Sequence, residues 1–164
     1  MSHLTRKFCS FCLLFLILIP SRADAKIKIM TTSEKYKYSS HVVIAKVLSV
    51  EETKKAISPG DPTDSKYKKN KAVVLCQSIF KGVVTTKTKL TLFFYTNANN
   101  EAIRLKKGQK YLFFVVKGKA SGICRVVNSS FGAIPIVSDK NSKPYKKYLK
   151  VREEVQSLAK KQKK

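Results

Sequence analysis

The stretch HVVIAKVLSV, residues 41–50, decides the fold. It is rich in β-branched residues, and Lys46 is its main polar interruption. A run of this kind predicts a β-strand that is buried over much of both faces. It is therefore the first strand of the predicted sheet, and the segments that follow it supply the partners.

Further strand-like segments follow along the chain, separated by turn residues. Residues 51–70 are polar, contain Pro59-Gly60-Asp61-Pro62 and lack periodicity, so they predict a long exposed loop. The predicted strands after this loop are KAVVLCQSIF at 71–80, LTLFFYT at 90–96, KYLFFVV at 110–116, residues 123–127 and a short edge piece at 134–137 that contains Pro135.

The end of the chain changes to a helical pattern. Pro144 suits a first helical position, and apolar positions then recur every three to four residues. These positions are Tyr148, Val151 or Arg152, Val155 and Leu158. The pattern predicts one amphipathic helix over residues 142–160, followed by a basic tail at 161–164.

Short strands, one long early loop and a terminal helix indicate a mainly β protein. The most economical interpretation is a small five- to six-stranded Greek-key barrel of the oligonucleotide/oligosaccharide-binding (OB) type with a C-terminal α-helix. An immunoglobulin-like sandwich is the alternative. We find no internal repeat, so residues 26–164 are expected to form a single domain.

Three short motifs resemble the netrin-like module of tissue inhibitors of metalloproteinases. They are HVVIAKVL at residues 41–48, Ile79-Phe80-Lys81-Gly82, and KGQKYLFF at residues 107–114. In this order they are similar to the strand opening, the "KG" turn and the "G-x-x-Y-L" strand start of that module. The resemblance covers roughly residues 39–124 and implies an OB-like, netrin-like barrel.

The same resemblance implies an alternative function as a protease inhibitor or other protein-partner ligand, acting through the barrel loops. Those inhibitors begin their mature chain with a cysteine that chelates the protease zinc and carry several disulfides. Here the expected first residue is Lys26, so the zinc-chelating residue has no counterpart. The fold implied by the resemblance therefore transfers more readily than the inhibition.

The first 25 residues have the pattern of a signal peptide. Arg6 and Lys7 precede an apolar run at residues 8–19, and Ala23-Asp24-Ala25 supplies a small-x-small cleavage site. About a dozen apolar residues are fewer than the roughly 20 that a membrane-spanning helix needs. We therefore expect cleavage near Ala25 and a secreted or periplasmic protein without a transmembrane segment in its mature chain.

The chain carries a formal net charge of +24, which is extreme for one small domain. Such an excess favours anionic partners through counterion release and long-range attraction. Candidate partners are a glycosaminoglycan, a nucleic acid, an anionic matrix or lipid surface, and an extracellular protein. Lysine outnumbers arginine, which favours diffuse attraction over bidentate contacts.

Three clusters interleave lysines with tyrosines and are the candidate anion-binding residues. They are Lys35, Tyr36, Lys37 and Tyr38; Lys66, Tyr67, Lys68 and Lys69; and Tyr145, Lys146, Lys147 and Tyr148. Such clusters can pair with anionic groups and stack on bases or sugars. The alternative is that the tyrosines cover the barrel and the lysines keep it soluble.

No pattern in the sequence indicates an enzyme or a cofactor. His41 is the only histidine after residue 25, and no serine–aspartate pattern lies near it. Neither a Gly-rich phosphate loop nor a zinc motif occurs. The leading expectation is thus a secreted, non-enzymatic binding module for an acidic macromolecule.

Cys76 and Cys124 remain after the signal peptide, where an oxidising compartment allows a disulfide. Pairing is the simplest expectation, and two buried free thiols are the alternative. With His41 they lack the ligand spacing of a metal site. Asn128-Ser129-Ser130 matches the N-glycosylation acceptor pattern, which makes Asn128 a candidate in a eukaryotic source.

Overall fold

The computed structural model describes residues 29–52, 67–97, 104–118 and 122–162. The expected signal peptide and its cleavage site, most of the loop expected at 51–70, Lys66 and the last two residues of the basic tail lie outside these ranges. The helices and strands are α2 (Thr32–Tyr38), β1 (His41–Glu52), β2 (Tyr67–Lys81), β3 (Lys89–Asn97), β4 (Lys110–Lys117), β5 (Ile123–Val126), the 3-10 helix η2 (Ser129–Gly132), β6 (Ala133–Ile136) and α3 (Lys143–Lys161).

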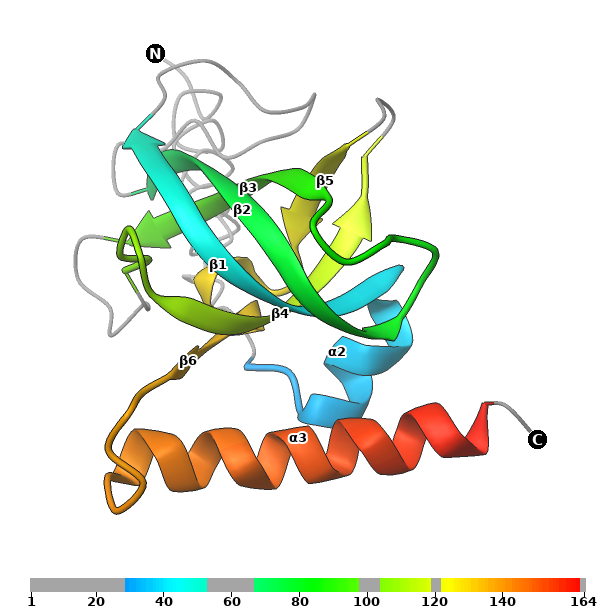
Figure 1. The fold of residues 1–164 in the computed structure, drawn as a ribbon. Coiled ribbons are helices and arrows are strands. Elements are labelled where there is room, and N and C mark those ends of the chain that lie inside the picture. The colour runs from blue at the N-terminus through cyan, green and yellow to red at the C-terminus, as the bar shows by residue number, and fades with distance from the viewer. Residues whose placement is uncertain (1–28, 53–66, 98–103, 119–121, 163–164) are drawn as a thin grey trace, which may run out of the picture.

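Five strands form a closed barrel in the order β1-β2-β3-β5-β4, and pairing between β1 and β4 closes it. The β3–β5 pair is parallel and the other pairs are antiparallel. Strand β6 adds to β4, where Pro135 lies opposite Tyr111. The expected mainly β, OB-like barrel with a C-terminal helix is confirmed (Figure 1).

Strand β4 shows why the apolar runs have few polar interruptions. Its residues Tyr111, Phe113 and Val115 belong to the core inside the barrel. The alternate residues Leu112 and Phe114 belong to a second core beneath the two helices. Both faces of the strand are buried because successive side chains point to opposite faces, and β1 alternates in the same way.

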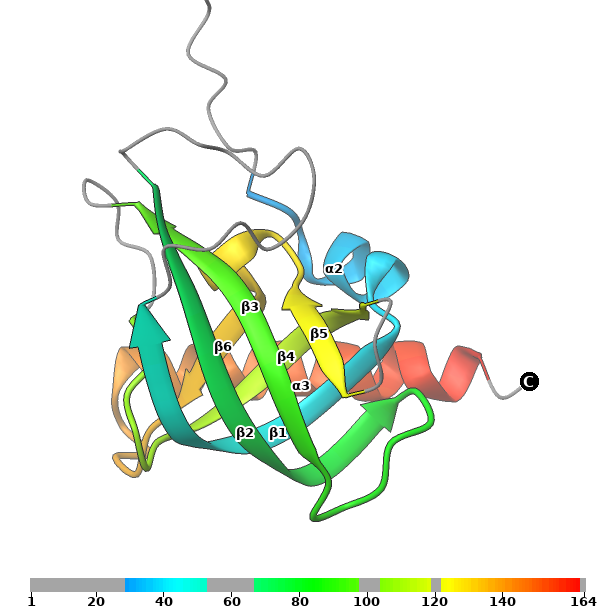
Figure 2. The same cartoon turned by 90° about the horizontal axis from the view of Figure 1, so that it is seen from above.

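Helix α3 packs across the outside of the barrel, and α2 lies against it (Figures 1 and 2). Tyr148, Val151 and Val155 are buried, whereas Arg152 is exposed, so Val151 occupies the position that the sequence left open. The helix begins after Ser142, whose hydroxyl accepts a hydrogen bond from the Tyr145 amide at 3.3 Å. The predicted C-terminal helix is confirmed, and it spans Lys143–Lys161.

Strand β2 begins at Tyr67, and the expectation that the loop extends to residue 70 is wrong. Asn70 lies opposite both Glu52 on β1 and Phe94 on β3. Pairing on both sides therefore extends the strand into a segment whose polar composition resembles a loop.

Helix α2 was not expected from the sequence. Thr31 and Glu34 form a capping box: the Thr31 hydroxyl accepts from the Glu34 amide at 3.2 Å, and the Glu34 carboxylate accepts from the Thr31 amide at 2.8 Å. This motif is visible in the sequence as T-x-x-E. The helix has seven residues, which is too short to show apolar periodicity.

Candidate functional site

The fold brings two of the three lysine–tyrosine clusters together. The first cluster lies on α2 and the third lies in the first turns of α3, and these helices pack against each other. The described residues of the second cluster, which begin at Tyr67, are at the start of β2, whereas Lys81 at the opposite end of that strand contacts α2. The second cluster is therefore separate from the other two.

Lys35 is the most unusual residue of this junction. It is only 9% exposed, although lysine is rarely buried without a partner. Burial, and then the neighbouring positive charge of Lys147, lower the pKa of its ammonium group. Within the described residues, no carboxylate forms a salt bridge with Lys35. A second cation thus approaches a cation that is already poorly solvated.

We call the lysines of the two clusters on α2 and α3, together with Lys150, the α2–α3 basic surface. It consists of Lys35, Lys37, Lys146, Lys147 and Lys150. The last three are exposed, and their spacing of three and four residues places them on one side of α3. The first turn of α3 holds no acidic residue, so the positive end of the helix dipole adds to their field.

The tyrosines of these clusters mainly hold the helices in place. Tyr36 is buried, and its hydroxyl donates to the Gln162 side chain at 3.2 Å. The Lys81 ammonium lies 4.7 Å from the centre of the Tyr36 ring. It also donates a hydrogen bond to the backbone carbonyl oxygen of Tyr36 at 2.8 Å. Tyr148 is buried, with its ring centre 6.1 Å from that of Tyr145.

Only Tyr38, at 61% exposed, offers a largely free ring in these two clusters. The tyrosines and the lysines of these clusters, which the sequence analysis treated as one binding group, therefore have different roles in the structure. The other rings pack, and most of the lysines face solvent. Lys81, which fixes α2 through Tyr36, was not among the expected site residues.

We expect the substitution Lys35→Met to raise the free energy of unfolding by about 1 kcal/mol. Methionine keeps the long side chain and removes both the burial of a charge and the repulsion by Lys147. Urea unfolding at neutral pH measures the change. Lys37→Met, on the exposed side of the same helix, is the control and should change stability by less than about 0.5 kcal/mol. Equal effects would contradict the strained environment of Lys35.

His41 is buried just after the C-terminal end of α2, at the start of β1. Its Nδ1 atom lies 2.8 Å from the Ser40 hydroxyl. Burial and then the positive charge of Lys117 lower the pKa of the ring below its ordinary value of 6.5. The neutral ring is therefore the form that the fold favours.

This direction predicts that stability falls as the pH drops below about 6.5, because the unfolded state then binds a proton that the folded state resists. The contribution is present above pH 6.5 and is lost as the pH falls through the lower pKa of the folded state. Unfolding by urea at pH 7.5 and pH 5 measures it. The variant His41→Gln should lose less stability over this interval, and an equal loss would contradict the prediction.

The two cysteines are free and buried, so the expected disulfide is absent and the alternative of two buried thiols holds. Both lie in the core inside the barrel. Burial raises the pKa of the Cys76 thiol to about 11 and raises that of Cys124. At neutral pH both are protonated thiols that act as apolar core residues.

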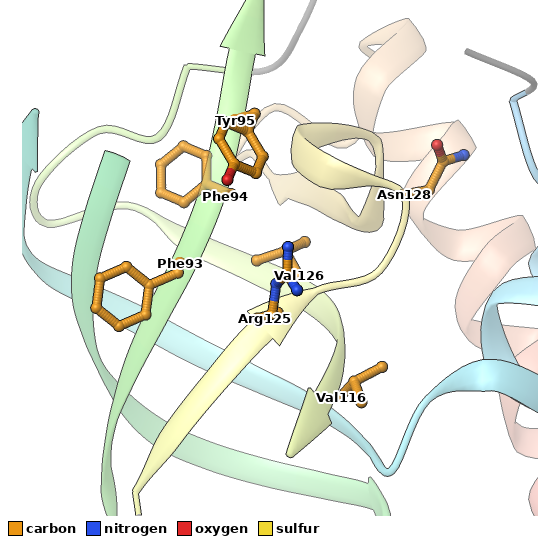
Figure 3. A pocket seen from close by; sticks show the side chains of 7 residues that line it. All are labelled: Phe93, Phe94, Tyr95, Val116, Arg125, Val126 and Asn128. Carbon is orange, nitrogen blue, oxygen red and sulfur yellow. The ribbon is translucent and has the colours of Figure 1, made fainter. Parts of the chain in front are cut away.

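A shallow pocket of about 350 Å³ lies on the outer side of β3, β5 and β4 (Figure 3). Phe93 and Val116 are both paired with Arg125, so these residues form a row across three strands. The lining residues are Phe93, Phe94, Tyr95, Val116, Arg125, Val126 and Asn128. Its described lining residues offer rings and a guanidinium group but include no acid–base pair.

Asn128, the candidate glycosylation residue, lies in the turn after β5 with a φ of 53° and a half-buried side chain. Asparagine adopts this left-handed conformation more readily than most residues. A glycan on Asn128 would lie at the pocket beside β5.

In the part of the chain that is described, no group of three His, Cys, Asp or Glu residues could hold a metal ion. None of the described helices combines the length and hydrophobicity required to cross a bilayer. No family model matches this chain, and no curated protein matches its sequence.

Proposed function

We propose that this protein is a secreted, non-enzymatic binding module with a netrin-like barrel, and that it engages an acidic macromolecule through the α2–α3 basic surface. The observation that carries the proposal is the burial of Lys35 beside Lys147. A buried cation next to another cation costs stability, and a bound anion offsets that cost. Export is the part of the proposal that rests on the N-terminal sequence.

The chemistry of the surface favours a polymer of negative charges. Lysine ammonium groups act as point charges and do not form the planar two-bond contacts that arginine makes. Several point charges along one side of a helix suit phosphate or sulfate groups that repeat along a chain. Binding of this kind releases counterions and weakens steeply as salt increases.

The direct experiment is a salt series with the purified protein that begins at Lys26. Heparin, duplex DNA and vesicles with anionic lipid are titrated between about 50 and 200 mM salt, with an unrelated protein of equal charge as the control. We expect this protein to bind one of the three ligands at least about tenfold more tightly than the control protein binds it. Equal binding of all three ligands by both proteins would show that the charge is generic.

Lys35→Met should weaken this binding while it stabilises the fold. We expect about a threefold to tenfold loss of affinity for the preferred polyanion at low salt, because one close positive charge is removed. Lys37→Met removes the same charge from an exposed position and should have a smaller effect. Unchanged affinity in Lys35→Met would separate Lys35 from the binding surface.

A further inference from the structure

A second pocket, of about 400 Å³, opens at the end of the barrel where β1 begins. Its wall comes from the turn between β2 and β3, the start of β3, the end of β4 and the start of β5. This volume falls in the range of small-molecule sites. None of the residues of the α2–α3 basic surface lines it.

The charged lining residues that the structure describes are basic. Lys89 and Lys117 line it, and no acidic residue is present among the described lining residues. The positive charge of Lys117 acts on two other groups of the wall: it adds to the effect of burial in lowering the pKa of His41, and it opposes the effect of burial, which raises the pKa of Cys124. Within the described residues, no carboxylate forms a salt bridge with Lys117.

His41 stays neutral at pH 7 and fills one side of the pocket. The groups that face it from the surrounding elements are the Ser40 hydroxyl, Lys117 at the end of β4 and the Gly82 turn. The Ser40 hydroxyl also accepts a hydrogen bond from the Lys117 amide at 2.6 Å. This network fixes the backbone that carries the Lys117 side chain.

Apolar side chains and two threonine hydroxyls form the rest of the pocket. Leu90 and Cys124 are buried and Val84 is partly buried, and all three belong to or pack against the core inside the barrel. Val83, on the same turn, is fully exposed. The hydroxyls of Thr85 and Thr88 lie 2.8 Å apart and satisfy each other. Apolar side chains beside two lysines, neither of which pairs with a described carboxylate, suit a ligand with one anionic end.

We infer that this pocket binds a small amphiphilic anion, whose carboxylate pairs with Lys117 and Lys89 and whose short apolar part packs on Val84 and Leu90. The site is distinct from the α2–α3 basic surface, and it goes beyond the proposed function. A polyanion has no apolar part for this interior, so the two sites take different ligands.

Octanoate is the probe, because it joins a carboxylate to an apolar chain of suitable size. Octanol has the chain without the charge, and acetate has the charge with almost no chain. Backbone amide shifts in NMR spectra of the folded protein locate binding, and the ring signals of His41 follow its titration. We expect octanoate at millimolar concentration to shift the amides of Val84, Leu90 and Lys117 and to raise the pKa of His41.

The matched variants are Lys117→Gln and Lys46→Gln, the latter at an exposed position of β1 outside the pocket. We expect Lys117→Gln to weaken octanoate binding about tenfold and Lys46→Gln to leave it unchanged. Absence of shifts at the pocket, equal binding of octanol and octanoate, or equal effects of the two substitutions would each overturn the inference. Heparin binding by these variants is measured separately and reports on the proposed function.

Discussion

Phe114→Ala is expected to lower the free energy of unfolding by about 3 to 5 kcal/mol. Phe114 is fully buried in the core between the barrel and the helices, together with Leu112, Tyr148 and Val155. Alanine removes most of this contact and leaves a cavity, because β4 is held by β1 on one side and β6 on the other. Urea unfolding followed by circular dichroism measures the change.

The control for this prediction is Val116→Ala, two residues further along the same strand. Val116 is 40% exposed, so its truncation should cost less than about 0.5 kcal/mol. Comparable losses for the two variants would contradict the burial of Phe114 in the core between the barrel and the helices. Helix α3 carries three lysines of the binding surface. If Phe114→Ala loosens α3 from the barrel, the substitution should therefore also weaken polyanion binding.

Gly82→Ala is the second substitution with a large expected effect, about 2 to 4 kcal/mol of destabilisation. Gly82 has a φ of 96°, a backbone conformation that residues other than glycine rarely adopt. A methyl group there would overlap the His41 ring and lie 2.7 Å from the Ser40 carbonyl oxygen. Backbone strain and steric overlap therefore add.

Gly108→Ala separates these two contributions. Gly108 has a similar φ of 85°, but a methyl group there would meet no atom within 4 Å. It should therefore cost only the backbone strain, about 1 kcal/mol. Thermal or urea unfolding compares the two variants, and equal losses would show that Gly82 and His41 are not in close contact. In a His41→Ala background the cost of Gly82→Ala should decrease.

The sequence predicted the barrel well because burial leaves a strong signal in it. The runs at 41–50 and 110–116 have few polar residues since the barrel interior takes one face of each strand and the helices cover the other. The terminal helix was predicted for a similar reason, because Tyr148, Val151 and Val155 repeat at helical spacing.

The candidate site was less predictable, because it depends on contacts between distant segments. The sequence shows that Lys35 and Lys147 belong to lysine–tyrosine clusters, but only the packing of α2 on α3 makes them neighbours. Burial of Tyr36 and exposure of Tyr38 likewise depend on this packing. Composition also favoured a disulfide between Cys76 and Cys124, whereas the structure holds both as thiols.

The measurement that tests the central claim most directly compares two triple variants of equal charge. One replaces Lys146, Lys147 and Lys150 by Gln on α3. The other replaces Lys106, Lys107 and Lys110, which are exposed at the turn before β4 and at its first residue. The affinity of each for heparin is determined across a salt series, with circular dichroism to show that both remain folded.

If the α2–α3 basic surface binds the polyanion, the first variant should lose at least about tenfold in affinity at low salt, and the dependence of its affinity on salt should become less steep. The second variant should stay within about threefold of the unsubstituted protein. Equal losses in the two variants would show that net charge alone accounts for binding, which would contradict the proposed site.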